Sequence, residues 1–162
     1  MVREISAGGV VLQDIAGVRH VALIEPRKDS ANDVRASSRP RRAVFALPKG
    51  LVDAGEKPEA TAIREVREET GLAAEPIVKL ADIKYVYVRT WGDGERVFKI
   101  VSFYLLRYVS GEIDAITPEM RIEVKRALWI PLEQAERRMA YSNERKVLRQ
   151  AQEYLLAHKL SE

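Results

Sequence analysis

The sequence predicts an α/β fold in which helices cover a mixed β-sheet on two sides. Segments rich in β-branched residues open the chain, one amphipathic helix interrupts them, and further helices close it. Strands and helices do not alternate regularly, as they would around an all-parallel sheet, so parallel and antiparallel pairs should both occur. The 162 residues suffice for one domain, 1–162, with a sizeable core.

The N-terminal part predicts two strands followed by a long loop. Residues 5–13 and 20–26 carry the valines, leucines and isoleucines that strands favour, and a short turn near 14–18 joins them. The stretch 27–43 is polar, lacks hydrophobic periodicity and contains a proline, so it is predicted to be a loop. A short strand is expected at 44–48, where a proline stops it.

A central helix is predicted between Pro58, which suits a first turn, and Gly71, which suits a C-terminal cap. On a helical wheel Ala60, Ile63 and Val66 share one side. We expect these three residues to be buried, while the carboxylates of the helix are presented on another face.

The C-terminal half predicts a hairpin, a strand and two helices. Long apolar and aromatic runs at 77–91 and 96–109 flank the turn sequence Gly-Asp-Gly-Glu. Residues 123–132 predict a strand that leads into a short helix at 133–139. A final helix is expected at 142–160, where apolar residues recur at helical spacing.

The composition excludes several classes of protein. The chain has no cysteine, which excludes disulfides, thiolate metal sites and cysteine nucleophiles. There is no run of about 20 apolar residues, so no membrane span is expected, and the N-terminus does not resemble a signal peptide. We therefore expect a cytoplasmic protein. The net charge of +3 suits phosphorylated ligands and is too small to indicate nucleic-acid binding.

Acidic residues crowd the predicted central helix. Glu65, Glu68 and Glu69 share an arc of about 100° on the wheel, and Glu56 stands in the loop before the helix. A solvated acidic face is one interpretation. However, this face lacks alternating lysines, and like charges at i and i+4 repel. Clustered carboxylate oxygens are what Mg²⁺ prefers, and a bound dication would turn the repulsion into attraction. The pattern therefore indicates a metal site.

Around these acids the sequence resembles the signature of the Nudix hydrolase family. That signature is a glycine, five residues, a glutamate, seven residues, and then Arg-Glu-apolar-any-Glu-Glu-any-Gly-apolar. The matching residues, with no departure, are Gly50, Glu56, Arg64, Glu65, Val66, Glu68, Glu69, Gly71 and Leu72. The resemblance implies a Nudix-type α/β/α sandwich with a mixed sheet. It also implies Mg²⁺-dependent hydrolysis of a nucleoside diphosphate linked to another group, with Mn²⁺ as an alternative ion.

The resemblance assigns roles to the acidic residues and to the arginine beside them. Glu65 and Glu69 are the firmest expected metal ligands. Glu68 is expected to be a further ligand or to orient the attacking water. Glu56 is expected to act through an ion pair with Arg64 or through a water on the metal, and Arg64 to orient carboxylates.

Further candidates lie outside the central helix. The Gly50 carbonyl is a candidate metal ligand. Some family members place the catalytic base in a later loop, where Glu119 and Glu123 are the candidates, with a plain surface role as the alternative for each. Lys49 and Arg42 are candidates for holding substrate phosphates. Arg42 belongs to the basic 27–43 loop, which is either a flap over a polyphosphate or a solvated loop.

The expected substrate is a small nucleotide or polyphosphate. The Leu-Pro-Lys-Gly sequence at 47–50 resembles a variant common in diadenosine polyphosphate hydrolases and in some nucleoside triphosphate members, which are MutT-like. Diadenosine polyphosphates are therefore the first expectation. Nucleoside triphosphates, oxidised ones among them, or a catalytically silent nucleotide-binding module, are the alternatives. We expect no nucleic-acid partner and no membrane, and a monomer or a homodimer.

A base of the substrate would need an aromatic side chain on which to stack. The candidates are Tyr85, Tyr87, Trp91, Phe103 and Tyr141. Core packing is the alternative role for each of them.

Overall fold

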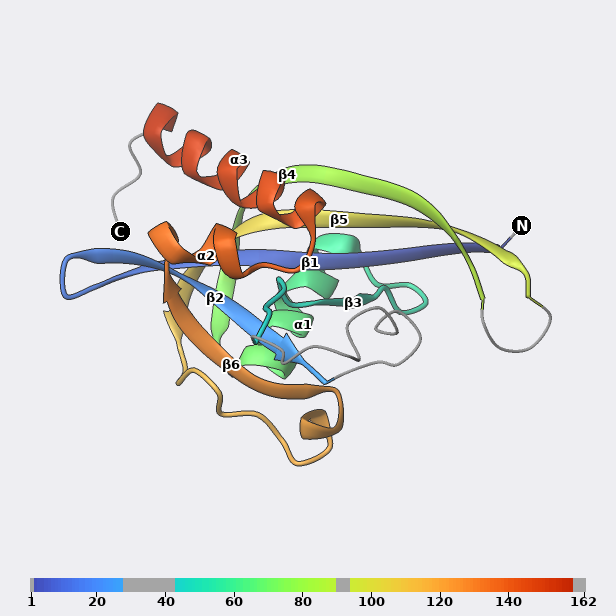
Figure 1. Cartoon of the computed structure of the whole chain (residues 1–162), viewed down its shortest axis with the longest axis horizontal. Helices are drawn as coiled ribbons and strands as arrows, with labels where there is room; N and C mark the ends of the chain where they lie inside the picture. Colours follow the sequence, from blue (N-terminus) through green and yellow to red (C-terminus); the bar gives the residue numbers. More distant parts are fainter. Residues whose placement is uncertain (1, 28–42, 90–93, 159–162) are drawn as a thin grey trace.

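The computed structural model describes residues 2–27, 43–89 and 94–158. In this part of the chain a six-stranded sheet has the order β4-β5-β1-β2-β6, with β3 paired to β1 (Figure 1). The strands are β1 (Val2–Ile15), β2 (Val18–Pro26), β3 (Lys49–Leu51), β4 (Ala73–Val88), β5 (Arg96–Ser110) and β6 (Val124–Pro131). The helices are α1 (Pro58–Thr70), α2 (Leu132–Arg138) and α3 (Ser142–His158), with a 3₁₀ turn η2 (Met120–Ile122).

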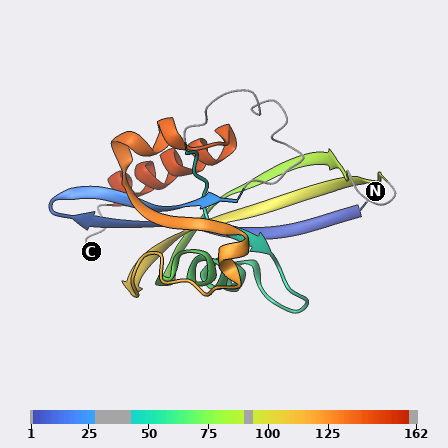
Figure 2. The same cartoon turned by 60° about the horizontal axis from the view of Figure 1, so that its bottom comes forward.

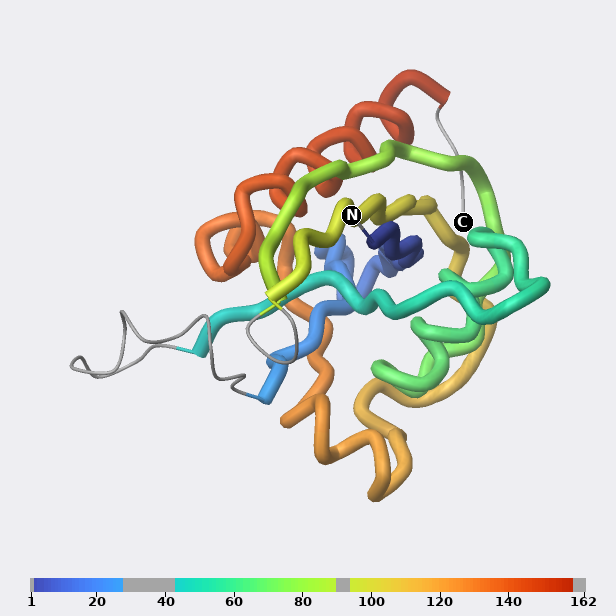
Figure 3. Tube along the Cα trace, turned by 90° about the vertical axis from the view of Figure 1, so that its right-hand side faces the viewer, coloured from blue at the N-terminus to red at the C-terminus, as the bar shows by residue number. Residues whose placement is uncertain are grey.

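The sheet is mixed, as predicted. Strands β1 and β5 pair in parallel, whereas β1 pairs with β2 and β3, β2 with β6, and β4 with β5 in antiparallel fashion. Helix α1 lies on one side of the sheet, and α2 and α3 lie on the other (Figures 2 and 3). This arrangement confirms the α/β class and the layered architecture expected from the sequence.

Each face of the sheet has its own apolar core. On the α1 side, Val11 packs in a cluster that includes Val66. On the α2 and α3 side, Val10 packs with Phe103 and Leu148. Neighbouring residues of β1 enter opposite cores because side chains alternate across a strand. The central strands are therefore apolar on both faces, which explains their continuous hydrophobic runs.

The strand predicted at 44–48 is wrong. Phe45 and Ala46 make only isolated bridges, to Met139 and Ile24, and the regular strand β3 begins at Lys49 instead. Pro48 has no N–H to donate to a ladder, so regular pairing starts only after it. The side chains of residues 45–47 are nevertheless buried, and this segment leads into β3.

Strand β4 begins at Ala73, earlier than the predicted residue 77. It is an edge strand of the described sheet, and its pairing with β5 shifts register between Pro76 and Val78. A proline is tolerated on an edge strand and at a register shift, because one backbone N–H can be missing there without loss of the strand pairing. This is why the proline did not stop the strand.

Helix α1 has the predicted ends but not the predicted buried face. Val66 is buried, but Ile63 is only partly buried and Ala60 is exposed. The face toward the sheet is made by Thr61, Ala62, Glu65, Val66, Glu69 and Thr70. The prediction that the carboxylates point away from the buried face is therefore wrong for Glu65 and Glu69. The prediction considered only the apolar side chains of the helix, whereas the folded protein also accommodates these two acids between α1 and the sheet.

None of the helices in the described ranges combines the length and the apolarity that a membrane crossing requires.

Replacing Gly71 by alanine should destabilise the protein by about 2–4 kcal/mol. Gly71 caps α1 in the left-handed conformation (φ 88°), and an added Cβ would meet the Glu112 carbonyl oxygen at 2.5 Å. Gly17 also has a positive φ, but nothing lies near its Cβ position, so Gly17→Ala should cost only about 1 kcal/mol. Urea denaturation of both variants measures the difference. Equal losses would contradict the packing argument.

Candidate active site

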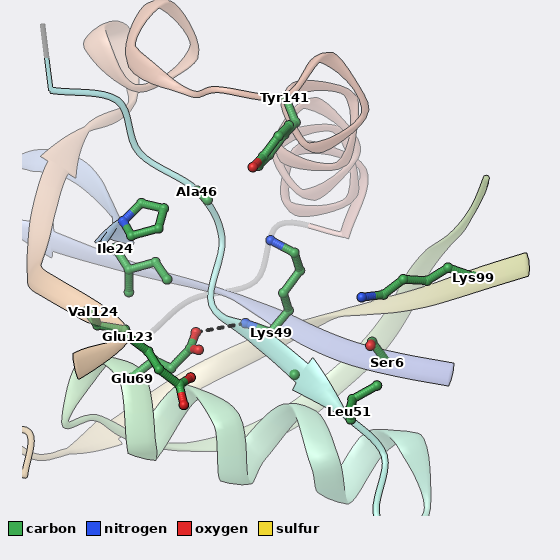
Figure 4. A pocket seen from close by; sticks show the side chains of 12 residues that line it. Ser6, Ile24, Ala46, Lys49, Leu51, Glu69, Lys99, Glu123, Val124 and Tyr141 are labelled. Atoms are coloured by element: carbon green, nitrogen blue, oxygen red, sulfur yellow. Dashed lines mark hydrogen bonds between the residues drawn. The ribbon is translucent and has the colours of Figure 1, made fainter. Parts of the chain in front are cut away.

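A pocket of about 250 Å³ opens where α1, β3, β5, the start of β6 and the residue before α3 meet (Figure 4). Lys49, Gly50, Glu69, Glu123 and Tyr141 line it together with residues of β1 and β2. Residues far apart in the sequence, from β1 to the N-terminal end of α3, thus share one cavity. Most of the residues singled out in the sequence analysis lie in or beside this pocket.

Arg64 is the centre of an ion-pair network beside the pocket. Its guanidinium makes a two-pronged contact with Glu56, with Nε–Oε2 at 2.8 Å and Nη2–Oε1 at 2.9 Å. Its Nη1 donates to Glu65 at 2.9 Å and to Glu68 at 3.2 Å, and its Nη2 donates to the Leu51 carbonyl at 3.1 Å. The planar guanidinium therefore joins three acids of the signature to strand β3.

Glu56 is tied down before α1 begins. The Arg64 side chain, the Thr61 hydroxyl and the Asp53 backbone N–H hold its pKa at about 2. The Thr61 hydroxyl donates to Glu56 Oε1 at 2.7 Å, and the Asp53 N–H donates to the same oxygen at 3.1 Å. Because its oxygens already accept these bonds, Glu56 is best suited to hold Arg64 in place.

Glu65 and Glu69 are buried on the sheet side of α1, with exposed fractions of 8% and 6%. Burial, followed by repulsion from Glu65, raises the pKa of Glu69 to about 8, although the Lys49 backbone N–H donates to it at 3.0 Å. Burial, followed by repulsion from Glu68, also raises the pKa of Glu65. Both carboxyl groups are thus held where the protein alone stabilises their charged forms poorly.

Gly50 makes room for this arrangement. A Cβ at position 50 would overlap the Glu65 carboxyl group, so glycine lets this carboxyl group lie against β3, and a larger residue would push it aside. The role of the Gly50 carbonyl as a metal ligand stays a prediction, while the pocket lining does include Gly50.

The two base candidates outside the signature differ in position. Glu123 lines the pocket, and its charge contributes to the raised pKa values of Glu65 and Glu69. Glu119 is exposed and lies outside the pocket lining. The geometry therefore favours Glu123 over Glu119. Glu68 is partly buried and keeps its contact with Arg64.

The acids suit a hard divalent cation by donor chemistry. The chain contains no cysteine, and Glu69 lines the pocket, where extra positive charge would relieve its repulsion by Glu65. Within the described residues, however, no three acidic or histidine side chains already converge closely enough to hold an ion. The Arg64 guanidinium instead lies between Glu65 and Glu68. The donors fit such a cation, although its coordination shell is not preformed.

Lys49 lines the pocket and has a partner that the sequence did not predict. Its ammonium pairs with Glu144 Oε2 at 2.9 Å and lies 5.4 Å from the centre of the Tyr141 ring. Burial alone would lower the pKa of Lys49, but the Glu144 carboxylate outweighs it and raises this pKa. Glu144 is itself 3% exposed, and its other oxygen accepts the Leu47 N–H at 2.8 Å.

Sequence reasoning missed Glu144. An acid in the first turn of a helix is usually read as a partner of the helix dipole, so nothing local distinguishes this residue. It also missed Ser6, whose hydroxyl is buried in the pocket lining without a hydrogen-bond partner in the described structure. Both residues become candidates only because the fold brings them next to residues that are distant in the sequence.

The aromatic candidates separate by burial. Tyr85 and Tyr141 are 41% and 52% exposed, and both lie close enough to Lys49 to share its electrostatic field. Tyr87 donates to Glu4 at 2.9 Å. Phe103 is enclosed in the core on the α2 and α3 side, so it is not available for stacking. Trp91, Arg42 and most of the basic loop lie outside the described residues.

The raised pKa of Glu69 predicts a pH dependence of stability in the metal-free protein. Between its ordinary value of 4.5 and its folded value of about 8, the folded state holds a proton that the unfolded chain has released. Stability should therefore fall as pH rises across this range, by up to about 1.4 kcal/mol per unit. Glu69→Gln should flatten the dependence. Urea denaturation in the presence of a chelator tests this, and parallel pH profiles for the two proteins would contradict it.

The chain is similar to known proteins over most of its length. A family model described as the NUDIX domain matches residues 16–151. Over 156 residues the chain is 38% identical to a protein of Mycobacterium tuberculosis (strain CDC 1551 / Oshkosh) that bears the name "Putative mutator protein MutT4". The match covers 95% of this chain and 56% of that protein. Over 117 residues it is 30% identical to the 8-oxo-(d)GTP phosphatase of Mycolicibacterium smegmatis, covering 72% and 33%.

The chain thus spans about half and about a third of the lengths of these two relatives. Among solved structures, an Ap4A hydrolase of C. elegans in a binary complex has a TM-score of 0.64 and 23% identity, and the match covers 95% of this chain and 98% of that one. That likeness concerns the fold. Together with the family match over most of the chain, it shows that this chain belongs to the Nudix hydrolase family.

Proposed function

We propose that this chain is a divalent-metal-dependent pyrophosphohydrolase, and that diadenosine polyphosphates are its substrates. The observation that carries the proposal is the burial of Glu69 in the lining of a pocket that also holds Lys49, with the buried Glu65 beside it on the same face of α1. Buried acids of raised pKa beside a cationic side chain suit a ligand that brings metal ions and phosphates together. Membership of the Nudix hydrolase family supports the same reaction class.

In this proposal Glu65 and Glu69 are the principal metal ligands, with Glu68 and the Gly50 carbonyl as further candidates. A divalent cation, Mg²⁺ or Mn²⁺, supplies neutralisation of phosphate charge and a more acidic water when it is bound. Arg64 holds the carboxylates in place through its contacts with Glu56, Glu65 and Glu68.

The proposed reaction is attack of a water oxygen on a phosphorus atom, with cleavage of the bond between that phosphorus and the bridging oxygen. The water proton passes to a carboxylate, for which Glu123 and Glu68 are the candidates. Glu123 is favoured by its place in the pocket lining. The displaced phosphate group leaves with the bridging oxygen.

The surroundings of Lys49 support a dinucleotide substrate. Tyr85 and Tyr141 offer exposed rings near its ammonium, so an adenine could stack there while the phosphates meet Lys49 and Lys99. The buried Ser6 hydroxyl, which has no hydrogen-bond partner in the described structure, would donate to a phosphate or ribose oxygen of this substrate.

Hydrolysis of oxidised nucleoside triphosphates is the second candidate function. One specific observation favours it, namely the identity of the two relatives named as a mutator protein and an 8-oxo-(d)GTP phosphatase. A nucleotide-binding module without catalysis is a third candidate, although buried and mutually repelling acids are a costly way to build a simple binder.

A substrate panel with Mg²⁺ and product identification tests the proposal. We expect diadenosine tetraphosphate to give ATP and AMP, and to be preferred over oxidised and ordinary nucleoside triphosphates and over ADP-ribose. Glu69→Gln should lower kcat by at least about a hundredfold, because it removes a charged metal ligand. Glu59→Gln, an exposed acid on the same helix, is the matched control and should retain activity.

Two results of this panel would decide between the candidates. Release of pyrophosphate from an oxidised nucleoside triphosphate, without turnover of dinucleotides, would favour the second candidate. If no substrate is turned over, and Glu69→Gln and the unaltered protein behave alike, the proposed enzymatic activity is contradicted.

The basic loop gives a separate prediction. Arg39, Arg41 and Arg42 are proposed to contact the polyphosphate as a flap; these three residues lie outside the described part of the chain. Neutralising all three to glutamine should raise KM more than it lowers kcat, because the contacts are made equally in the ground and transition states. Steady-state kinetics measure the two effects, and an unchanged KM would rule the flap out.

A further inference from the structure

Lys49 lies between two sets of acids. On one side its ammonium pairs with the buried Glu144. On the other side its backbone N–H donates to Glu69, next to Glu65 and Glu123. Figure 4 shows the Lys49 side chain pointing toward Tyr141, away from the side of the pocket that holds Glu69 and Glu123.

The acids on the two sides attract the same ammonium group. Both Glu144 and Glu69 contribute electrostatically to the raised pKa of Lys49, with Glu144 making the larger contribution. The flexible four-carbon stem of Lys49 starts beside Glu69, since its own backbone bonds that carboxylate. An ammonium that turned toward Glu69 would sit where a divalent cation is needed and would neutralise part of the negative charge that attracts it.

We propose that Glu144 is a positioning residue that keeps the Lys49 ammonium away from the metal-binding carboxylates, so that these remain open to a divalent cation. The inference rests on the divalent-cation site of the proposed function. It assigns a role to a buried acid whose contacts in the described structure are with Leu47 and Lys49 and not with Glu65, Glu68 or Glu69.

The contacts of Glu144 suit this task. Its two oxygens have different partners, the Leu47 N–H at 2.8 Å and the Lys49 ammonium at 2.9 Å. The first bond fixes the carboxylate to the segment that carries Lys49, so the second holds the ammonium in one place. Lys99 repels Lys49 from the β5 side of the pocket, which leaves the Glu144 side and the Glu69 side as the two favourable positions.

Glutamine at position 144 separates the two contacts. Glu144→Gln keeps an oxygen that can accept the Leu47 N–H but loses the negative charge that retains Lys49. The freed ammonium should then turn to the Glu69 side and compete with the metal. The double variant Glu144→Gln/Lys49→Met removes the competitor together with its partner, which also avoids leaving one buried charge unpaired.

Direct binding of Mn²⁺, measured by electron paramagnetic resonance of the free ion without substrate, tests the proposal. Glu144→Gln should weaken Mn²⁺ binding about tenfold, because a nearby charge acts strongly in a partly buried site. The double variant should recover the affinity of the unaltered protein to within about threefold. Glu153→Gln removes an exposed acid from the same helix and should change nothing. Circular dichroism checks that each variant is folded.

Distinct outcomes separate this inference from the proposed function. If the unaltered protein does not bind Mn²⁺, the proposed metal site itself fails. If it binds Mn²⁺ and Glu144→Gln binds equally well, only the positioning role is overturned. A double variant that binds as weakly as Glu144→Gln overturns it as well, because the loss then does not pass through Lys49. If Glu144→Gln alone does not fold, weak Mn²⁺ binding by a folded double variant still refutes the proposal.

Discussion

The burial of two carboxylates beneath α1 is the constraint on which the rest of the site depends. Glu65 and Glu69 occupy helix positions that face the sheet, where periodicity would ordinarily place apolar side chains. The absence of a side chain on Gly50 gives the Glu65 carboxyl group its space, and two apolar cores on opposite faces of the sheet hold the surrounding elements together. The molecule therefore buries acidic side chains at the candidate site and mainly apolar side chains elsewhere.

Two charged residues outside this pair organise the region in opposite ways. Arg64 is partly exposed and gathers Glu56, Glu65 and Glu68 around one guanidinium. Glu144 is buried and engages a single ammonium together with one backbone N–H. The first arrangement arises within one stretch of sequence, whereas the second joins α3 to the segment before β3. Arg64 thus orders the carboxylates from within their own helix, whereas Glu144, at the start of α3, holds the ammonium of Lys49.

Much of this could be predicted from the sequence because the decisive signals are local. Pro58 and Gly71 marked the ends of α1, the two long apolar runs marked the β4–β5 hairpin, and the spacing of the acids indicated the site. The failures have nonlocal causes. The buried face of α1 depends on the space that Gly50 leaves in a neighbouring strand, which a helical wheel does not contain. Glu144 and Ser6 acquire roles only through residues that are distant along the chain.

The parallel pairing of β1 with β5 has a consequence for how the molecule folds. Val2 pairs with Val97 and Leu12 with Arg107, so this central ladder closes a very large loop that contains the whole signature segment. The entropy of closing such a loop must be overcome before its contacts stabilise anything, which makes pairings of this kind slow. Helix α1 and the β4–β5 hairpin can begin to form locally, but Ser6 of β1 and Lys99 of β5 come together in the pocket lining only when the ladder closes. The pocket is therefore a late product of folding, and nascent chains that lack β5 cannot possess it.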